Sequence, residues 1–365
     1  MNAVEHLNAC GQSVWYDNVE RGLLDSGEME RLIGEGVSGV TSNPTIFERA
    51  ITASNAYDEE ILRASKENQS IDEIYDQLTF GDICRVTDLL LPVYEKRNYS
   101  DGYVSIEVSP RLCRDTEATV REGLRLFKGI NKPNVMIKVP ATEEGIPAIQ
   151  KLIEEGINVN ATLIFSVDMY ERVAEAYLSG LESRFRDGLD LRVASVASFF
   201  VSRIDTAVDN LIKSNQLGED LLGKAGIANA KMAYKKFEEK FAGPRFEKLR
   251  SYGAMVQRPL WASTGVKDPR YPELLYVSSL VGRHTVNTMP PRTLEAVMGQ
   301  TEGFVETVKV NVQEAEAFFD RLGKQGISFA DVTDKLLTEG LEAFEKSFVA
   351  LLQNLSDKSE LLRHK

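Results

Sequence analysis

The chain has 365 residues, of which 43% are hydrophobic and 27% are charged; these proportions are ordinary for a globular protein. Its 43 basic and 55 acidic side chains give a formal net charge of −12, which excludes a general basic field for nucleic acid but not a local cation that binds an anion. Three cysteines without C-x-x-C spacing and three separated histidines argue against a disulfide framework, a zinc cluster and a histidine-rich metal site.

The sequence also lacks the usual targeting segments. Its first residues have no basic stretch followed by an apolar core, so they do not resemble a signal peptide. No apolar run approaches the roughly 18 residues that a membrane span needs. We therefore expect a cytoplasmic protein without a membrane partner.

Short apolar runs alternate with longer helical patterns along the chain. We expect strands over Ser13–Asp17, Gly39–Ser42, Tyr103–Val108, Val135–Val139, Val159–Phe165, Val193–Phe200, Val256–Ala262 and Thr285–Asn287. Several of these runs are continuously apolar, as is typical of parallel strands that are covered on both faces. Eight strands, each followed by a helix, predict an α/β fold of the (β/α)8 TIM-barrel type with additional helices. A doubly wound sheet would show the same periodicity.

Helical segments are expected between and after the strands. Ser70 to Glu73 reads as a capping box that opens a helix, and Thr142 is expected to cap the helix after the fourth strand. From about residue 310 onward the chain is expected to form a helical extension of a single barrel domain spanning residues 1–365. The extension has one apolar stripe, which includes Leu337, Leu341, Phe344, Phe348, Leu351 and Leu355. Packing on the barrel wall is the favoured interpretation of this stripe; closing over the active site or docking a second subunit is the alternative.

Polar residues inside otherwise apolar strands suggest a shared polar centre, because burying them unsatisfied is costly. Lys138 is the most informative, since its strand neighbours on both sides are apolar. Burial disfavours the ammonium form of a lysine and leaves an amine that can attack a carbonyl. A strand-end lysine that reaches solvent, or one paired with a structural carboxylate, would show the same pattern.

Two carboxylates on other strands strengthen the interpretation of Lys138. In a barrel, Asp17 and Glu107 can both lie near its amine, and Schiff-base chemistry needs proton transfers at each step. Alternatively, Asp17 caps the segment that follows it, and Glu107 pairs with Arg111 or Arg114.

Further polar side chains are candidates for binding a substrate. Asn43 and Asn160 can hold sugar hydroxyls, since an amide offers both donors and an acceptor, although Asn43 is also suited to the turn at Pro44. An anionic substrate group could be held by Ser198 with Arg203, or by Ser263 with Lys267. Arg203 could instead form an ion pair within its helix, with Asp205 or Asp209.

At these residues the sequence resembles the transaldolase family, in its longer bacterial branch. The matching blocks, which lie between Trp15 and Asn287, are Thr41-Ser42-Asn43-Pro44-Thr45, Ile106-Glu107-Val108, Met136-Ile137-Lys138-Val139-Pro140-Ala141-Thr142, Gly156-Ile157-Asn158-Val159-Asn160-Ala161-Thr162-Leu163-Ile164-Phe165-Ser166 and Val196-Ala197-Ser198-Phe199-Phe200-Val201-Ser202-Arg203. Each block alone is weak, whereas their joint order is highly specific.

The resemblance implies an (α/β)8 barrel without a metal or organic cofactor. It also implies transfer of a dihydroxyacetone unit between sugar phosphates in the pentose phosphate pathway. By the same resemblance, Lys138 forms the Schiff base, Asp17 takes a proton as the carbon–carbon bond breaks, and Glu107 acts with a water that Thr162 positions. Asn43 and Asn160 then hold the three-carbon fragment, while Ser198 and Arg203 bind near the substrate end.

One block departs from the family pattern. The short-form family has an arginine shortly after the Ala-Ser that follows the seventh strand, whereas this chain has Lys267 after Ala262-Ser263. Lys267 would act as a point charge rather than a bidentate fork. A fructose 6-phosphate aldolase that releases dihydroxyacetone and a catalytically inactive barrel scaffold remain the competing functions, and the sequence leaves a homo-oligomer open.

Overall fold

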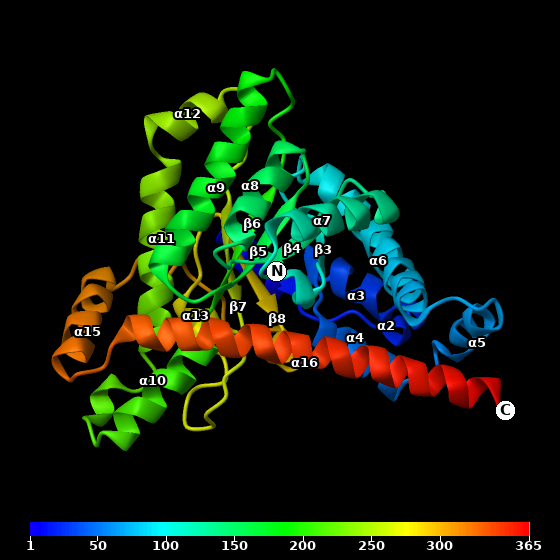
Figure 1. Cartoon of the computed structure of the whole chain (residues 1–365). Helices are drawn as coiled ribbons and strands as arrows, with labels where there is room; N and C mark the ends of the chain where they lie inside the picture. Colours follow the sequence, from blue (N-terminus) through cyan, green and yellow to red (C-terminus); the bar gives the residue numbers. More distant parts are fainter. Residues whose placement is uncertain (365) are drawn as a thin grey trace.

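The molecule, described here by a computed structural model for residues 1–364, is built on a closed barrel of parallel strands (Figure 1). Within those residues, eight strands follow one another around the barrel in chain order, and the last pairs with the first. Their bounds are β1 (Gln12–Tyr16), β2 (Gly39–Thr41), β3 (Val104–Glu107), β4 (Val135–Pro140), β5 (Val159–Ile164), β6 (Ser195–Phe200), β7 (Arg258–Ala262) and β8 (Thr285–Met289). The predicted (β/α)8 barrel is confirmed, and the doubly wound sheet is excluded because β1 and β8 are paired.

Helices surround the barrel. Those up to β5 are α1 (Ala3–Ala9), α2 (Arg21–Asp25), α3 (Glu28–Gly34), α4 (Pro44–Ala53), α5 (Asp58–Lys66), α6 (Ile71–Lys96), the 3-10 turn η1 (Pro110–Leu112), α7 (Thr116–Ile130) and α8 (Gly145–Glu154). Those after β5 are α9 (Val167–Arg186), α10 (Ser202–Ser214), the 3-10 turn η2 (Glu219–Leu221), α11 (Ala225–Phe241), α12 (Pro244–Arg250), α13 (Leu275–Ser279), α14 (Pro291–Met298), α15 (Val312–Lys324) and α16 (Phe329–Arg363). None of the helices within residues 1–364 combines the length and the apolar character needed to cross a bilayer.

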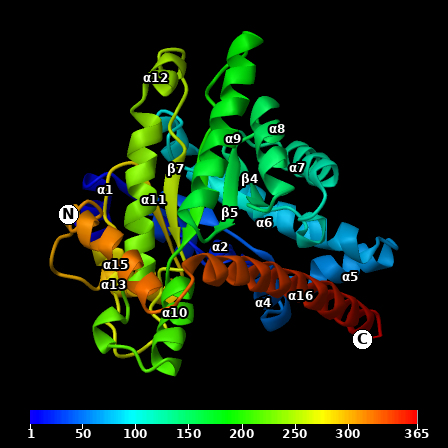
Figure 2. The same ribbon diagram turned by 60° about the vertical axis from the view of Figure 1, so that its left-hand side comes forward.

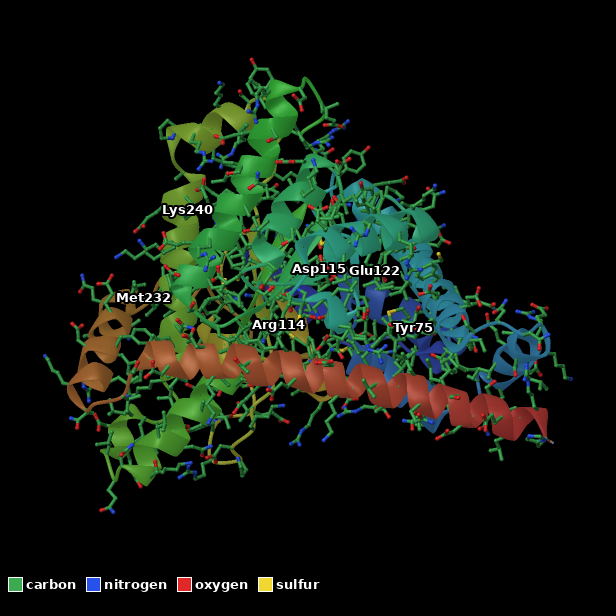
Figure 3. All side chains as sticks on the ribbon, viewed as in Figure 1. Tyr75, Arg114, Asp115, Glu122, Met232 and Lys240 are labelled. Carbon is green, nitrogen blue, oxygen red and sulfur yellow. The ribbon has the colours of Figure 1, made fainter. Side chains whose placement is uncertain are left out.

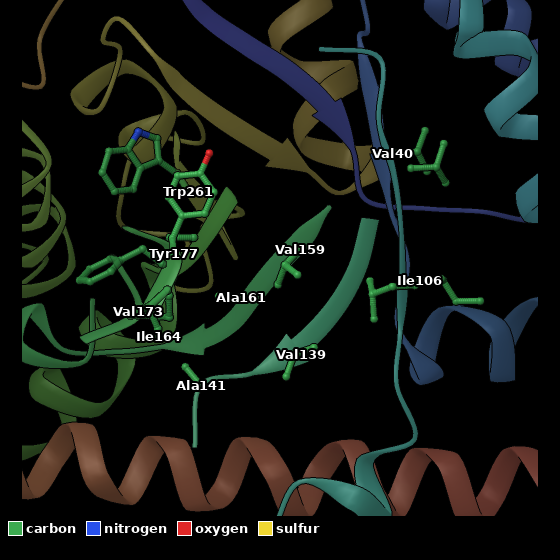
Figure 4. Packing of buried hydrophobic residues seen from close by; sticks show 14 of the residues in the cluster. Val40, Ile106, Val139, Ala141, Val159, Ala161, Ile164, Val173, Tyr177 and Trp261 are labelled. Carbon is green, nitrogen blue, oxygen red and sulfur yellow. The ribbon is translucent and has the colours of Figure 1, made fainter. Parts of the chain in front are cut away.

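Alternation along the strands separates two apolar layers. On β4, Val135, Ile137 and Val139 belong to the core between the barrel and its helices, which Figure 4 shows in part, whereas Met136 belongs to the core inside the barrel. Because successive strand residues point to opposite faces, Lys138 points into the barrel with Met136. Inside the barrel, the apolar layer that contains Met136 is therefore followed, toward the carboxyl ends of the strands, by a polar layer that contains Lys138.

Local sequence chemistry accounts for several helix boundaries. The predicted capping box is confirmed, because the Ser70 hydroxyl accepts from the backbone N–H of Glu73 and the Glu73 carboxylate accepts from that of Ser70. Thr142 was predicted to cap the helix after the fourth strand, and this prediction is wrong because the cap lies two residues later. Helix α8 begins at Gly145 with Glu144 as its N-cap residue, although the Thr142 hydroxyl does accept a hydrogen bond from the Gly145 N–H at 2.9 Å.

Helix α16 is a 35-residue helix that crosses the carboxyl-terminal mouth of the barrel. Figures 1 and 4 show it passing below the ends of the strands, and it contacts α4, α5, α6, α10 and η1. Helix α15 packs instead against α11 (Figure 2). The helical extension from about residue 310 is therefore confirmed. The favoured packing on the barrel wall is confirmed for Phe348 and Leu355, which contact α4, α5 and α6, whereas Phe344 reaches the cavity above Lys138, so the alternative of closing over the site holds for that part of the stripe.

Candidate active site

The register of the barrel brings Lys138 between two of its predicted partners. Glu107 on β3 and Asn160 on β5 are its direct register partners, so all three side chains point into the barrel at one level. The Lys138 amine lies 3.2 Å from a Glu107 carboxylate oxygen and donates to the backbone carbonyl of Ser42, also at 3.2 Å. Since Lys138 is only 5% exposed, the amine is buried, and the alternative of a lysine that reaches solvent is excluded.

Asp17, directly after β1, lines the same cavity as Lys138 and is close enough for their charges to interact. Its carboxylate accepts a hydrogen bond of 2.6 Å from the Thr41 hydroxyl, which in turn lies 2.6 Å from the Thr288 hydroxyl. Burial raises the pKa of Asp17, against the opposing influences of Lys138 and Thr41. Asp17 thus contacts the neighbouring strands instead of capping its own segment, and its carboxyl group is suited to both giving and taking a proton.

Glu107 is buried with few partners. Apart from Lys138, its carboxylate has no hydrogen-bond partner in residues 1–364, and burial raises its pKa despite the Lys138 charge. The suggested pairing with Arg111 or Arg114 is not formed within the described chain. The buried hydroxyl of Thr162 also lacks a partner there, so both groups are available to a substrate or a water.

Asn160 and Ser198 form a connected pair beside Lys138. The Ser198 hydroxyl donates to the Asn160 carbonyl at 2.7 Å, and the Asn160 amide donates to the Ser105 hydroxyl at 3.0 Å.

Asn43 is the N-cap residue of α4 and accepts from the Ile46 N–H at 3.0 Å. Asn43 therefore caps the helix that begins at Pro44 instead of serving a turn there, and its amide NH2 group remains for another acceptor.

A cavity of about 160 Å³ opens above the Lys138 amine. Most of the predicted site residues line it: Asp17, Asn43, Lys138, Thr162, Ser198, Arg203, Ser263 and Lys267. Glu107 and Asn160 do not line it, although both are register partners of Lys138; Glu107 lines a neighbouring cavity of about 260 Å³. The structure thus joins most of the predicted residues in one pocket and places the other two beside Lys138.

Arg203 and Lys267 stand where this cavity meets a larger groove. Both also line a groove of about 940 Å³ between α10 and the start of α16. The suggested ion pair within α10 is not formed: Asp205 accepts from the Gly226 N–H at 2.7 Å, and Asp209 accepts from the Gly223 N–H at 3.0 Å. Arg203 instead lies over the Phe200 ring, with burial lowering the guanidinium pKa.

Ser263 holds the loop that carries Lys267. Its hydroxyl lies 2.9 Å from that of Ser202 at the start of α10, and its φ of +57° is in the left-handed region. A non-glycine residue in this region is strained, and such strain is often found where a loop must place a functional group. Lys267, four residues later, then lines the cavity wall.

The structure also adds residues that the sequence reasoning missed. Phe344 of α16 lines the cavity, and the Lys138 amine lies 5.6 Å from the centre of its ring. Gly340, one turn earlier, allows the close approach: a Cβ there would come within 3.1 Å of the Leu163 side chain. The apolar stripe was the only sequence feature that included Phe344. Thr288 was missed as well, and Thr41 was part of a matching block but had no role assigned, because a threonine in a strand is common.

Comparison with known proteins identifies the family. A family model described as transaldolase/fructose-6-phosphate aldolase matches residues 14–355. A transaldolase from Saccharopolyspora erythraea is 46% identical, with 97% of each chain covered. One from Mycolicibacterium smegmatis is 46% identical, with 95% of this chain and 94% of the relative covered. Transaldolase 2 from Nostoc punctiforme is 42% identical, with 99% and 98% covered. The chain therefore belongs to the transaldolase/fructose-6-phosphate aldolase family.

Proposed function

We propose that this protein is a transaldolase that moves a dihydroxyacetone unit from a ketose phosphate to an aldose phosphate through a Schiff base on Lys138. The ketose phosphate would be sedoheptulose 7-phosphate or fructose 6-phosphate, and the acceptor glyceraldehyde 3-phosphate or erythrose 4-phosphate, as in the pentose phosphate pathway. The observation that carries the proposal is the buried Lys138 amine between two carboxyl groups, Glu107 and Asp17. Relatives covering nearly the whole chain are named transaldolase.

In the first half-reaction, the Lys138 amine attacks the C2 ketone and forms a carbinolamine, with its proton passing to a neighbouring carboxylate. Loss of water gives the imine, and Glu107 supplies and takes up the protons, with a water that Thr162 positions. Asp17 then takes the proton of the C4 hydroxyl as the C3–C4 bond breaks. The aldose phosphate leaves, and an enamine of three carbons stays on Lys138.

In the second half-reaction, the enamine carbon attacks the acceptor aldehyde, and Asp17 returns its proton to the new hydroxyl. Water then hydrolyses the imine and frees the product. A raised pKa brings a carboxyl group closer to neutral pH, where it can serve as acid and base in turn. The burial of Asp17 and Glu107 provides this.

The two connected cavities suit a substrate with two unlike ends. The cavity of about 160 Å³ above Lys138 is small enough to confine a three-carbon fragment, whose hydroxyls Asn43 and Ser198 would bind. We propose that Asn160 orients Ser198 through the hydrogen bond between them. Arg203, Lys267 and Ser263, at the junction with the groove, would bind the phosphate.

Phe344 favours transfer over release of dihydroxyacetone. Its ring covers the Lys138 amine at the mouth, so that water has restricted access to the enamine. This observation speaks for a transaldolase against an aldolase of the same family. The amine and the two carboxyl groups complete the proposed chemistry, so we propose that no metal or organic cofactor takes part.

The substrate class suggests where the protein works. Phosphorylated sugars are charged and are kept inside the cell, so we propose a cytoplasmic enzyme.

The test is to trap the intermediate. The protein is incubated with fructose 6-phosphate and reduced with borohydride, and the modified peptide is identified by mass spectrometry. We expect an adduct of three carbons on Lys138 that is absent from Lys138→Ala, and transfer of the fragment when glyceraldehyde 3-phosphate is added. A folded protein without an adduct at Lys138 would refute the Schiff base. An adduct with release but no transfer would make the protein an aldolase.

A further inference from the structure

A second cavity, of about 550 Å³, opens at the opposite end of the barrel. Its wall reaches Trp15, Met136 and Val196 inside the barrel, and within residues 1–364 it shares no lining residue with the cavity above Lys138. The amino-terminal end of a (β/α)8 barrel is normally the end that serves stability. A cavity of ligand size at that end therefore needs a separate explanation.

The inner wall of this cavity carries a buried ion pair whose partners are already occupied. Asp101 and Arg258 lie 3.7 Å apart. The Asp101 carboxylate accepts from the Trp15 indole at 2.8 Å and from the Ser13 hydroxyl. Arg258 donates to Ser13 at 2.6 Å and to the Thr285 carbonyl at 2.7 Å. This carboxylate is thus not free to neutralise further cations at the rim.

The rim adds positive charge that is poorly balanced. Arg97 and Arg250 both line the cavity. Arg97 is exposed and has no ion pair within residues 1–364, and its charge is close enough to lower the pKa of Arg258. Arg250 pairs at 2.8 Å with Glu247, but both side chains are about half exposed, so that pair is weak. On a chain whose net charge is −12, this rim is a local exception.

His284 is exposed to the same positive electrostatic potential. It lines the cavity, and burial together with the positive charges of Arg258, Arg250 and Arg283 lowers its pKa.

The backbone near the rim is strained at two residues. The φ of His284 is +58°. Tyr99, which precedes the lining residue Ser100, has a φ of +66°. Left-handed backbone at non-glycine residues is strained and concentrates at functional sites, and here it occurs on two sides of one cavity.

The wall also offers an acceptor. Gln12 lines the cavity and is fully buried, and its amide nitrogen donates to the Leu280 carbonyl at 2.7 Å. Its carbonyl oxygen has no hydrogen-bond partner in residues 1–364. A buried acceptor without a donor is unfavourable, and a ligand hydroxyl or a water can supply one.

We propose that this cavity, the amino-terminal cavity, binds a small organic phosphate monoester that carries hydroxyl groups. The phosphate dianion would lie at the rim with Arg97, Arg250 and His284, and the hydroxyl-bearing part would extend inward toward Gln12. The size of the cavity favours an organic phosphate over inorganic phosphate, which would fill only a small part of about 550 Å³. The site is separate from Lys138, so the proposal does not rest on the proposed catalysis.

His284 can serve as an NMR probe of the cavity. It lines the cavity, and with three histidines in the chain the ring proton signals are few. The ring proton resonances of the full-length protein would be followed by NMR, with His284 assigned through His284→Gln. The ligands are glycerol 2-phosphate, which has no carbonyl to react with Lys138, and inorganic phosphate, both at constant ionic strength. We expect saturable shifts of the His284 signal, an increase in its titration midpoint in the bound state, and tighter binding of glycerol 2-phosphate than of phosphate.

Three variants locate the effect. Loss of one charged hydrogen-bonding partner in Arg97→Ala should weaken binding about tenfold, whereas Arg97→Lys should keep most of it. Arg203→Ala, at the other end of the barrel, should leave the His284 response unchanged. Shifts that do not saturate, or that persist in Arg97→Ala with unchanged affinity, would overturn the site. Equal affinity for both ligands would overturn its assignment to an organic phosphate.

Discussion

At the residue scale, the sequence predicts the types of the proposed catalytic groups and that two carboxylates can lie near Lys138, but not which atoms are in contact. Lys138 was identifiable because a lysine inside an apolar strand is unusual, and Glu107 because it lies inside another. Their contact depends on the register of β3 and β4, which the closure of the barrel fixes and no local pattern encodes. The same applies to Ser198 and Asn160, which the sequence treats as separate ligands and the structure joins by a hydrogen bond.

The two carboxyl groups should fail at different steps when replaced. Glu107→Gln keeps the shape but not the proton transfer, so we expect the borohydride-trapped adduct on Lys138 to form about 10² to 10⁴ times more slowly. Asp17→Asn can still accept the Thr41 hydrogen bond, but it cannot take the C4 proton. The adduct trapped from fructose 6-phosphate should then contain six carbons instead of three. An unchanged trapping rate in Glu107→Gln, or a three-carbon adduct in Asp17→Asn, would contradict these roles.

Asp205 should make stability depend on pH. Burial raises its pKa to about 7, above the unfolded value, so its contribution is fully present below about pH 4 and is lost as the pH rises to about 7. Asp205→Asn keeps an acceptor for the Gly226 N–H and removes the titration. We expect it to be more stable than the parent at pH 8, by at most about 4 kcal/mol, with little difference at pH 4.

Urea unfolding across this pH range measures that effect. The exposed Asp187, which follows α9, provides a control, and Asp187→Asn should follow the pH dependence of the parent. Parallel stability curves for Asp205→Asn and the parent would show that the Asp205 carboxyl does not titrate in this range.

At the element scale, the sequence predicts the strands well and the placement of the last helix poorly. All eight predicted strands overlap the observed ones, because a short apolar run between helical patterns is a local property. The stripe on α16 shows which face of the helix is buried, but it does not show which surface covers that face. The contacts of α16 with α4, α5 and α10 come from parts of the chain that are far away in sequence.

Replacing each of two phenylalanines on α16 distinguishes covering of the Lys138 amine from packing of the helix. Phe344 lies over Lys138, whereas Phe348, one turn later, packs against Tyr75, which lies on α6 beside α16 (Figure 3). Both are buried, so replacement of either by alanine should cost about 3–5 kcal/mol of stability. Phe344→Ala alone should release more dihydroxyacetone relative to transfer, at least severalfold, because water gains access to the enamine.

The measurement is the ratio of free dihydroxyacetone to transferred product at saturating acceptor. If Phe348→Ala raised this ratio as much as Phe344→Ala, the effect would belong to the seating of α16 as a whole. The specific role of the Phe344 ring would then be refuted.

At the scale of the whole molecule, closure of the barrel links the two ends of a long segment. β1 pairs with β8 along its whole length, from Gln12 with Thr285 to Tyr16 with Met289, and α16 then packs across elements from both halves of the chain. We propose that residues 1–365 form one folding unit, as the sequence suggested.

Such a unit should unfold in one cooperative step. The two tryptophans, Trp15 and Trp261, are fully buried in the barrel, so their fluorescence reports the sheet, while far-UV circular dichroism is dominated by the helices. We expect the two signals to change with the same midpoint in urea. Loss of helical signal well before the fluorescence changes would indicate that α15 and α16 unfold as a separate unit.

The position of α16 also has a consequence for how the protein is made. A ribosome completes β8, which ends at Met289, well before it completes α16, which begins at Phe329. The nascent barrel can therefore close while the mouth above Lys138 is still open to the cell. During that interval the buried amine would be accessible to any reactive aldehyde, so the last helix to be translated also ends the period in which the nascent chain is chemically vulnerable.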